Sequence, residues 1–165
     1  MKPPAPALLT AALAALLVAC GGESTPAADA PAATPPPAPS AGLPSLPGAE
    51  MQRLVDSATY IDYVFFEQAF SMSMNEPSAI RYALANVSPQ PAAPRQACPA
   101  IGRIFYKIGG RTVHEADLHF APGCTYLKFY GPDQQPAYAN ELSPTGKAFF
   151  NSQFRQLIPN YSDIE

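Results

Sequence analysis

The segment His114-Glu115-Ala116-Asp117-Leu118-His119 brings together imidazole and carboxylate groups that could bind a metal ion or transfer protons. The helical zinc-protease motif needs its two histidines four residues apart, but here they are five apart on a segment that alternates like a strand. The two rings therefore face opposite sides. Glu115, Asp117 and His119 share one side, where they could ligate a divalent ion or serve a hydrolase as acid and base. We favour a solvated strand face with a cross-strand Asp117–Lys128 ion pair.

A second candidate, Met72-Ser73-Met74, resembles the Met-x-Met pairs of periplasmic copper carriers. No histidine or third methionine lies near it in the sequence, so we interpret the pair as packing at a helix end. The chain contains no Gly-x-Ser-x-Gly elbow, Cys-x-x-Cys pair, phosphate loop or Rossmann glycine pattern. We therefore assign no catalytic residue, no metal ligand and no cofactor.

Three tyrosines are predicted on the polar side of the same strands. Tyrosine contributes a large rigid surface with a polar tip and is enriched where proteins bind partners. The high strand propensity of tyrosine is the simpler explanation for their presence. The candidate binding face of the domain consists of Tyr106, Tyr126, Tyr130, Glu115, Asp117, His119 and Lys128.

Composition narrows the range of partners. The chain has 165 residues, of which 14% are charged, and its formal net charge is −3. Nucleic-acid binding needs concentrated lysine and arginine to neutralise phosphates, and no basic cluster occurs in this sequence. We therefore expect no nucleic-acid partner.

The N-terminal residues have the pattern of a secretory signal peptide: Lys2 and then an apolar run over 7–19, which is too short to span a membrane. The run ends Leu17-Val18-Ala19-Cys20, which resembles the lipobox of bacterial lipoprotein precursors. This resemblance implies cleavage after residue 19, and a Cys20 that carries a diacylglyceryl group and an acyl chain such as palmitate. Two or more such chains hold a protein stably on a bilayer.

The residue after Cys20 bears on the destination of the protein. In bacteria with two membranes, aspartate at this place favours retention in the inner membrane, and this chain has Gly21. The resemblance therefore implies an outer-membrane lipoprotein, with the bilayer as one partner and the folded domain in the periplasm or at the cell surface.

The remaining cysteines, Cys98 and Cys124, then form an even pair in an oxidising compartment, where such pairs are usually disulfides. The predicted strand register places them two strand spacings apart, about 9–10 Å. A disulfide needs Cα atoms within about 7 Å, so Pro99 must bend the chain inward.

Residues 20–48 are rich in proline and alanine and contain no aromatic side chain. Such a segment cannot bury enough apolar surface to offset its ordering entropy, so we expect a disordered, semi-stiff tether. The folded domain is predicted to occupy residues 49–165.

The periodicity of this domain predicts an α+β fold in two layers. A helix is expected over residues 50–70 and a second one after Asn75, with Pro77 in its first turn. Residues 88–99 contain four prolines and are expected to form a loop. From residue 100 the period changes to two, which predicts a four-stranded antiparallel meander followed by a helix over 144–158 capped by Ser143.

The turns predict the register of the meander. Gly109-Gly110 suits a two-residue hairpin turn that pairs Ile108 with Arg111, and Pro122-Gly123 suits a turn that pairs Ala121 with Cys124. With this register, one face collects Ile101, Phe105, Ala116, Leu118, Phe120, Leu127 and Phe129, and the other collects the seven residues of the candidate binding face. A slip of one residue would mix the two sets.

These observations favour a non-catalytic, membrane-anchored lipoprotein whose small domain binds an envelope protein, peptide or other ligand through the sheet face or an edge strand. Two alternatives stay open. One is a hydrolase that uses the carboxylate and histidine face, and the other is a metal-handling protein that uses Met72, Met74 or His119.

Overall fold

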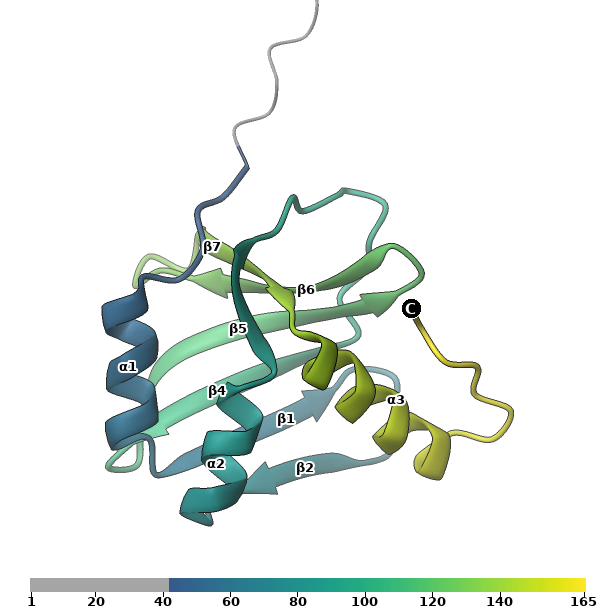
Figure 1. The fold of residues 1–165 in the computed structure, drawn as a ribbon, viewed down its shortest axis with the longest axis horizontal. Coiled ribbons are helices and arrows are strands. Elements are labelled where there is room, and N and C mark those ends of the chain that lie inside the picture. The colour runs from purple at the N-terminus through teal and green to yellow at the C-terminus, as the bar shows by residue number, and fades with distance from the viewer. Residues whose placement is uncertain (1–41) are drawn as a thin grey trace, which may run out of the picture. The chain divides into compact units, whose positions relative to one another are not determined.

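The computed structural model describes residues 42–165, so the predicted signal peptide, Cys20 and most of the tether lie outside the described residues. The elements of the described part are shown in Figure 1. In chain order they are α1 (Gly48–Ser57), β1 (Tyr60–Phe65), β2 (Ser71–Met74), α2 (Pro77–Leu84), β3 (Val87–Pro91), β4 (Gly102–Ile108), β5 (Arg111–Ala121), β6 (Cys124–Tyr130), β7 (Pro136–Leu142) and α3 (Pro144–Leu157).

The seven strands form one antiparallel sheet in the order β2-β1-β4-β5-β6-β7-β3. All three helices lie over the same face of this sheet, which we call the inner face (Figure 1). The core is formed between the helices and this face. Its largest fully buried side chains include Tyr63, Tyr106, Phe129, Phe150, Leu54, Ile61, Ile104, Leu118 and Leu127.

The predicted long first helix is wrong, because the helix ends at Ser57 and the chain continues as β1 and β2. Ile61, Tyr63 and Phe65 are buried whereas Val64 is 41% exposed, which is the period of a strand. The segment is rich in aromatic and β-branched residues, which favour strands. Its apolar positions also fit a helical stripe, so the pairing of β1 with β4 decides that the segment forms a strand and not a helix.

The predicted loop after the second helix is also wrong in part, because Val87–Pro91 forms β3 at one edge of the sheet. Pro89 and Pro91 have no N–H to donate, and proline is tolerated on an edge strand for that reason. The predicted arrangement of two N-terminal helices and a four-stranded meander is therefore replaced by three helices and seven strands.

The C-terminal half matches the prediction more closely. The pairing of β5 with β6 is confirmed residue by residue, from Ala121 opposite Cys124 to Ala116 opposite Phe129. Gly109 and Gly110 both have positive φ, at 56° and 81°, as the predicted hairpin turn requires. Ser143 caps α3 by accepting a hydrogen bond from the backbone N–H of Gly146 at 3.0 Å.

A β-bulge changes the register between β4 and β5. Tyr106 lies opposite His114 and Lys107 lies opposite Thr112, so Val113 is the extra residue. The bulge therefore places each side chain of β4 on the face of the sheet opposite to the predicted one. Tyr106, predicted on the candidate binding face, is 1% exposed in the core. Phe105, predicted in the core, lies opposite Glu115 on the other face.

The folded domain begins earlier than residue 49. Leu46 is buried in the core, and its N–H donates to the Asn140 side chain at 2.8 Å. The N–H of Ala139 in β7 donates to the Pro44 carbonyl at 2.8 Å. The segment before α1 therefore packs beside β7, and the expected tether is ordered at its C-terminal end.

The predicted disulfide between Cys98 and Cys124 is present, with Cα atoms 5.8 Å apart. It ties the segment between β3 and β4 to the start of β6. A small buried cluster forms under this segment on the face of the sheet opposite the helices. Its buried members are Ala92, Cys98, Cys124, Tyr126 and Ala139.

We expect Cys98→Ser to lower the free energy of unfolding by about 3.5 kcal/mol, because the disulfide closes a loop between residues 26 positions apart. Urea denaturation of the wild type, Cys98→Ser, Cys124→Ser and the double variant measures this. The double variant should lose no more than either single variant, since all three lack the same bond. Losses that simply add would contradict a stabilising disulfide.

Candidate functional site

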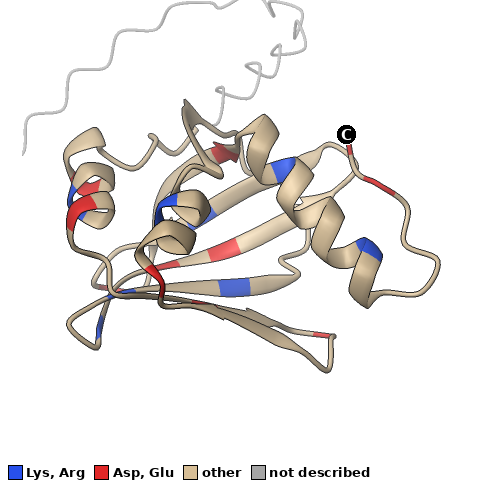
Figure 2. Cartoon of the chain, turned by 60° about the horizontal axis from the view of Figure 1, so that its bottom comes forward, with Lys and Arg blue, Asp and Glu red and all other residues tan. Residues whose placement is uncertain are grey.

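The face of the sheet opposite the helices, here called the outer face, carries most of the predicted site residues. Acidic and basic positions are interleaved on the sheet strands (Figure 2). Strand alternation and the observed register place a polar and aromatic set on this side. The set consists of Tyr60, Asp62, Val64, Arg103, Phe105, Lys107, Glu115, Asp117, His119, Tyr126, Lys128 and Tyr130.

Asp117 is the centre of a charge network on this face. It lies directly opposite Arg103 on one neighbouring strand and Lys128 on the other. One Asp117 oxygen is 2.8 Å from Arg103 Nη2 and 2.9 Å from Arg103 Nε, and the other is 3.6 Å from Lys128 Nζ. The Tyr130 hydroxyl donates to the second oxygen as well. This buried carboxylate is thus compensated by two cations and a hydroxyl.

The predicted Asp117–Lys128 pair is confirmed, and the Arg103 partner was missed. The predicted solvated strand face is wrong at Asp117 and His119, which are both buried. The predicted register placed Arg103 opposite Ala116 because it lacked the bulge at Val113. Arg103 also lies 3.6 Å from Glu115, which extends the network along β5.

Tyr130 is held between cations. Arg103 lies 4.8 Å and Lys128 5.6 Å from the centre of its ring, which are cation–π distances. Burial first, and then the hydrogen bond to Asp117, raises the pKa of Tyr130 to about 12. The hydroxyl therefore stays protonated at physiological pH and acts as a hydrogen-bond donor to Asp117.

A second polar and aromatic group lies on β1, β2 and β4. Asp62 accepts a hydrogen bond from the Ser73 hydroxyl at 2.8 Å and lies 3.8 Å from Lys107. Lys107 in turn lies 5.1 Å from the centre of the Tyr60 ring. The outer face thus repeats one arrangement, in which a carboxylate, a cation and a tyrosine ring meet across neighbouring strands.

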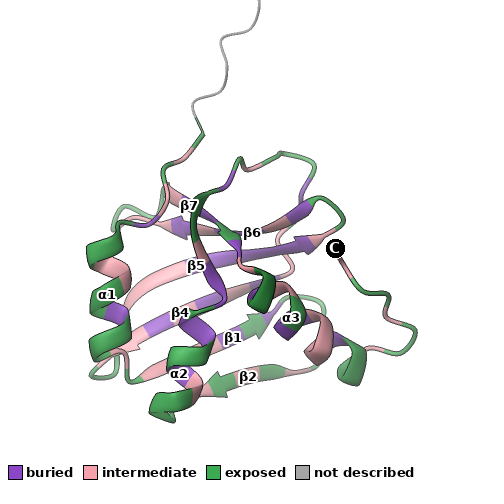
Figure 3. Cartoon of the chain, viewed as in Figure 1, coloured by how far each residue is buried: buried purple, intermediate pink, exposed green. Residues whose placement is uncertain are grey.

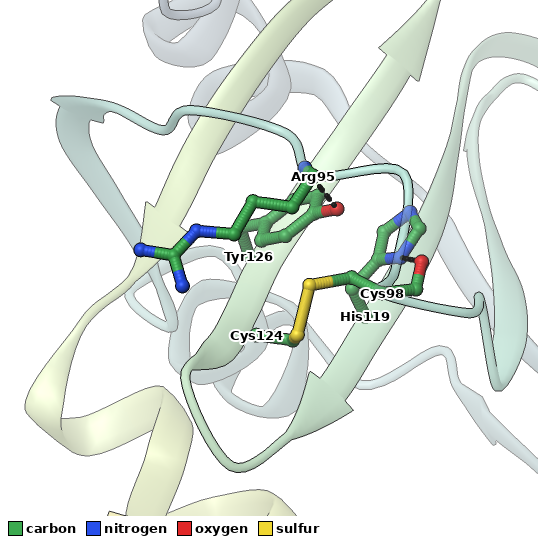
Figure 4. Close-up of a disulfide and its surroundings, with 5 residues drawn as sticks. All are labelled: Arg95, Cys98, His119, Cys124 and Tyr126. Atoms are coloured by element: carbon green, nitrogen blue, oxygen red, sulfur yellow. Dashed lines mark hydrogen bonds between the residues drawn. A yellow bond between two sulfur atoms is a disulfide. The ribbon is translucent and has the colours of Figure 1, made fainter.

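His119 and Tyr126 lie beneath the disulfide-linked segment and are not available on the open surface (Figure 4). Their rings stack with centres 4.3 Å apart. His119 Nδ1 is 2.9 Å from the Cys98 carbonyl, which can only accept, so this nitrogen carries the proton. Burial, and then the charge of Lys128, lowers the pKa of His119 and keeps the ring neutral.

A cavity of about 460 Å³ adjoins the charge network at one end of the sheet, and residues from both faces line it. Glu115 and Tyr130 belong to both the network and the cavity. Glu50 from α1 lies across from them, 3.2 Å from His114 Nε2, and this hydrogen bond is the main cause that lowers the pKa of Glu50. The other lining residues are Thr112, Val113, Gly131, Pro132, Gln134, Ala137 and Tyr138. Nothing in the sequence near His114 pointed to Glu50 in the first helix.

The residues of the two alternative hypotheses do not converge. Glu115 lines the cavity, whereas Asp117 is held in its ion pairs and His119 is buried at the other end of the face. Met72 and Met74 pack against the core from the inner side of β2, and His119 faces the outer side of β5. Among residues 42–165, no group of three or more histidine, cysteine, aspartate or glutamate side chains could hold a metal ion.

Comparisons with protein-family models, with curated proteins and with solved structures found no match for this chain. In the described part of the chain, no helix has both the length and the apolar character needed to cross a membrane.

We expect the stability of the domain to fall as the pH drops below 6.5, the ordinary pKa of histidine. In that range the unfolded chain takes up a proton at His119 that the folded domain does not bind, so the free energy of unfolding decreases. Urea midpoints at about pH 7.5 and about pH 5 should differ less in His119→Gln than in the wild type. An equal decrease in both proteins would contradict a buried, neutral His119.

Proposed function

We propose that this chain is a non-catalytic lipoprotein of the bacterial cell envelope, anchored through Cys20, whose outer sheet face binds a partner protein or peptide. One observation carries the binding part of this proposal. All three helices cover the inner face, and the stretch of the outer face from β1 to β6 has no covering element in residues 42–165 except the disulfide-linked segment at one end.

The chemistry of the open stretch suits a protein surface. Among its charged side chains, Arg103, Lys107 and Lys128 are matched by Asp62, Glu115 and Asp117, so there is no excess charge to attract phosphates. The charged groups of these cations lie over tyrosine rings, and Phe105 and Val64 add apolar area. Tyrosine and arginine surrounded by satisfied polar groups are typical of recognition surfaces.

The cavity beside the charge network supplies a pocket for one anchoring side chain of the partner. Two carboxylates of the described residues line it, Glu50 and Glu115, and each also lies near a cation of this chain, Arg53 at 3.1 Å and Arg103 at 3.6 Å respectively. The edges of Tyr130 and Tyr138 add aromatic surface. A lysine or arginine side chain of the partner fits this lining best, because its stem can pack on the rings while its charge meets the carboxylates.

The envelope part of the proposal rests on the sequence. The run that ends in Leu17-Val18-Ala19-Cys20 supports processing and lipidation, and Gly21 supports the outer membrane. The Cys98–Cys124 disulfide is consistent with an oxidising compartment. The hydrolase and metal-handling alternatives are disfavoured by the separation of their residues.

The anchor is tested with the full chain expressed in a bacterium with two membranes. We expect intact-mass spectrometry to find a mature protein that begins at Cys20 and carries acyl chains, located in the outer-membrane fraction. Cys20→Ser should leave the membrane fraction, since the thiol is the attachment point of the diacylglyceryl group. Equal membrane partition of both proteins would contradict the anchor.

The binding face is tested by photo-crosslinking in the same cells. A photoreactive amino acid at Phe105, on the outer face, should give a defined adduct with an envelope protein other than this chain. The same amino acid at Arg81 or Gln156, which are exposed on the helical side, is the matched control and should not. Charge reversal by Glu115→Lys should weaken adduct formation by roughly tenfold, which corresponds to about 1.4 kcal/mol. Adducts from the helical side alone, or from neither side, would contradict the proposal.

A further inference from the structure

The two edge strands of the sheet, β3 and β2, differ in how far their residues prevent pairing with a further strand. At one edge, β3 carries Pro89 and Pro91, and the segment before α1 adds a hydrogen bond from Ala139 to Pro44. Prolines and covering segments prevent another strand from adding to a sheet. At the other edge, β2 reads Ser71-Met72-Ser73-Met74 and contains neither proline nor charge.

The free edge of β2, which is the edge away from β1, has backbone groups that pair with no other strand of the described residues. β2 pairs only with β1, and in residues 42–165 no other backbone hydrogen bond reaches it. Its side chains alternate between exposed serines and half-buried methionines (Figure 3). Such an edge presents N–H and C=O groups in the arrangement that a further antiparallel strand needs.

Exposed apolar side chains occur on the elements that precede and follow β2 in the chain. Among the described residues, five large apolar side chains are exposed. Val64 lies opposite Ser71 on β1, Phe66 directly follows β1 and is 53% exposed, and Tyr82 is 49% exposed on α2, the element after β2. Val64 and Phe66 thus lie on or next to the strand paired with β2, whereas the Tyr82 ring packs 5.9 Å from the Phe149 ring of α3.

We propose that β2 pairs antiparallel with β2 of a second copy of this chain, about a two-fold axis perpendicular to the sheet that passes between the two Ser73 residues. Directly opposite residues of antiparallel strands share a face. With Ser73 opposite Ser73, Met72 lies opposite Met74 and Met74 opposite Met72. The four methionines then extend the inner layer, and the serines extend the outer face.

The strand is suited to pair with itself because it is neutral and alternates in the same way on both sides of Ser73. A two-fold interface requires one surface patch to be complementary to itself, and like charges opposite each other would prevent that. The charge directly opposite Ser73, on Asp62 of β1, is already bonded to Ser73 and lies close to Lys107. Flexible methionine side chains adapt to each other across such a contact.

The consequence is a continuous sheet through both copies with all helices on one side. The two outer faces then lie side by side and form one surface. The proposed dimer is independent of the anchor and of the partner, so its failure would leave the proposed binding function standing.

The register is tested with Ser73→Cys in the full chain, purified in detergent and mildly oxidised. Directly opposite residues have Cα atoms about 4.5–5.5 Å apart, within the range of a disulfide, so a covalent dimer is expected on a non-reducing gel. Ser71→Cys is the matched control, on the same strand and the same face. The two copies of residue 71 would lie about 14 Å apart along the strands, at roughly 3.4 Å per residue, which is too far for a disulfide.

The association itself is tested with Ser73→Lys. Two lysines would then face each other across the axis, whereas within one copy the new lysine can pair with Asp62. Light scattering of the full chain in detergent should give a dimer for the wild type and a dimer at least roughly tenfold weaker for this variant, with unchanged thermal unfolding of the domain. A monomeric wild type, equal crosslinking of Ser73→Cys and Ser71→Cys, or crosslinking through Met72→Cys instead would overturn the proposal.

Discussion

The eleven-residue strand β5 lies in the middle of the sheet, and its pairing with β4 and β6 sets the chemistry of both faces. Ala116, Leu118 and Phe120 point into the core, while Glu115, Asp117 and His119 point to the outer face. The buried Asp117 is compensated by Arg103 and Lys128, which lie directly opposite it, and by the Tyr130 hydroxyl. The charge network and the strand register therefore stabilise each other. A slipped strand would leave a carboxylate without its cations and place apolar side chains in water.

The bulge at Val113 determines which side chains lie beside the charge network and the cavity. It reverses the facing of β4, which sends Tyr106 into the core and brings Arg103 to Asp117. The same irregular part of β5 lines the cavity together with Glu50 of α1. Bulges commonly redirect side chains next to binding sites, and here one inserted residue sets the Arg103–Asp117 pairing and also lines the cavity beside it.

The disulfide divides the outer face into a covered part and an open part. Cys98–Cys124 holds the segment after β3 over His119 and Tyr126, which makes that end a second small core. The open part keeps its polar groups satisfied by each other, as in the Asp62–Lys107 and Arg103–Asp117 pairs. A surface of satisfied polar groups and aromatic rings can be buried by a partner at low desolvation cost, which agrees with a binding role for this face.

Local rules were sufficient to predict the turns, the β5–β6 register, the Ser143 cap and the disulfide from the sequence. Each of these features depends on a few neighbouring residues or on cysteine pairing. The lipobox pattern at Cys20 is likewise local, and it remains a prediction. Tertiary structure alone decided the rest. The residues of β1 fit both a helical stripe and a strand, and pairing with β4 selected the strand. β3 forms by pairing with β7 at the edge of the sheet, where Pro89 and Pro91 are tolerated. The bulge at Val113 has no sequence signature, so the places of Tyr106, Arg103 and Glu50 followed from long-range packing that no local pattern encodes.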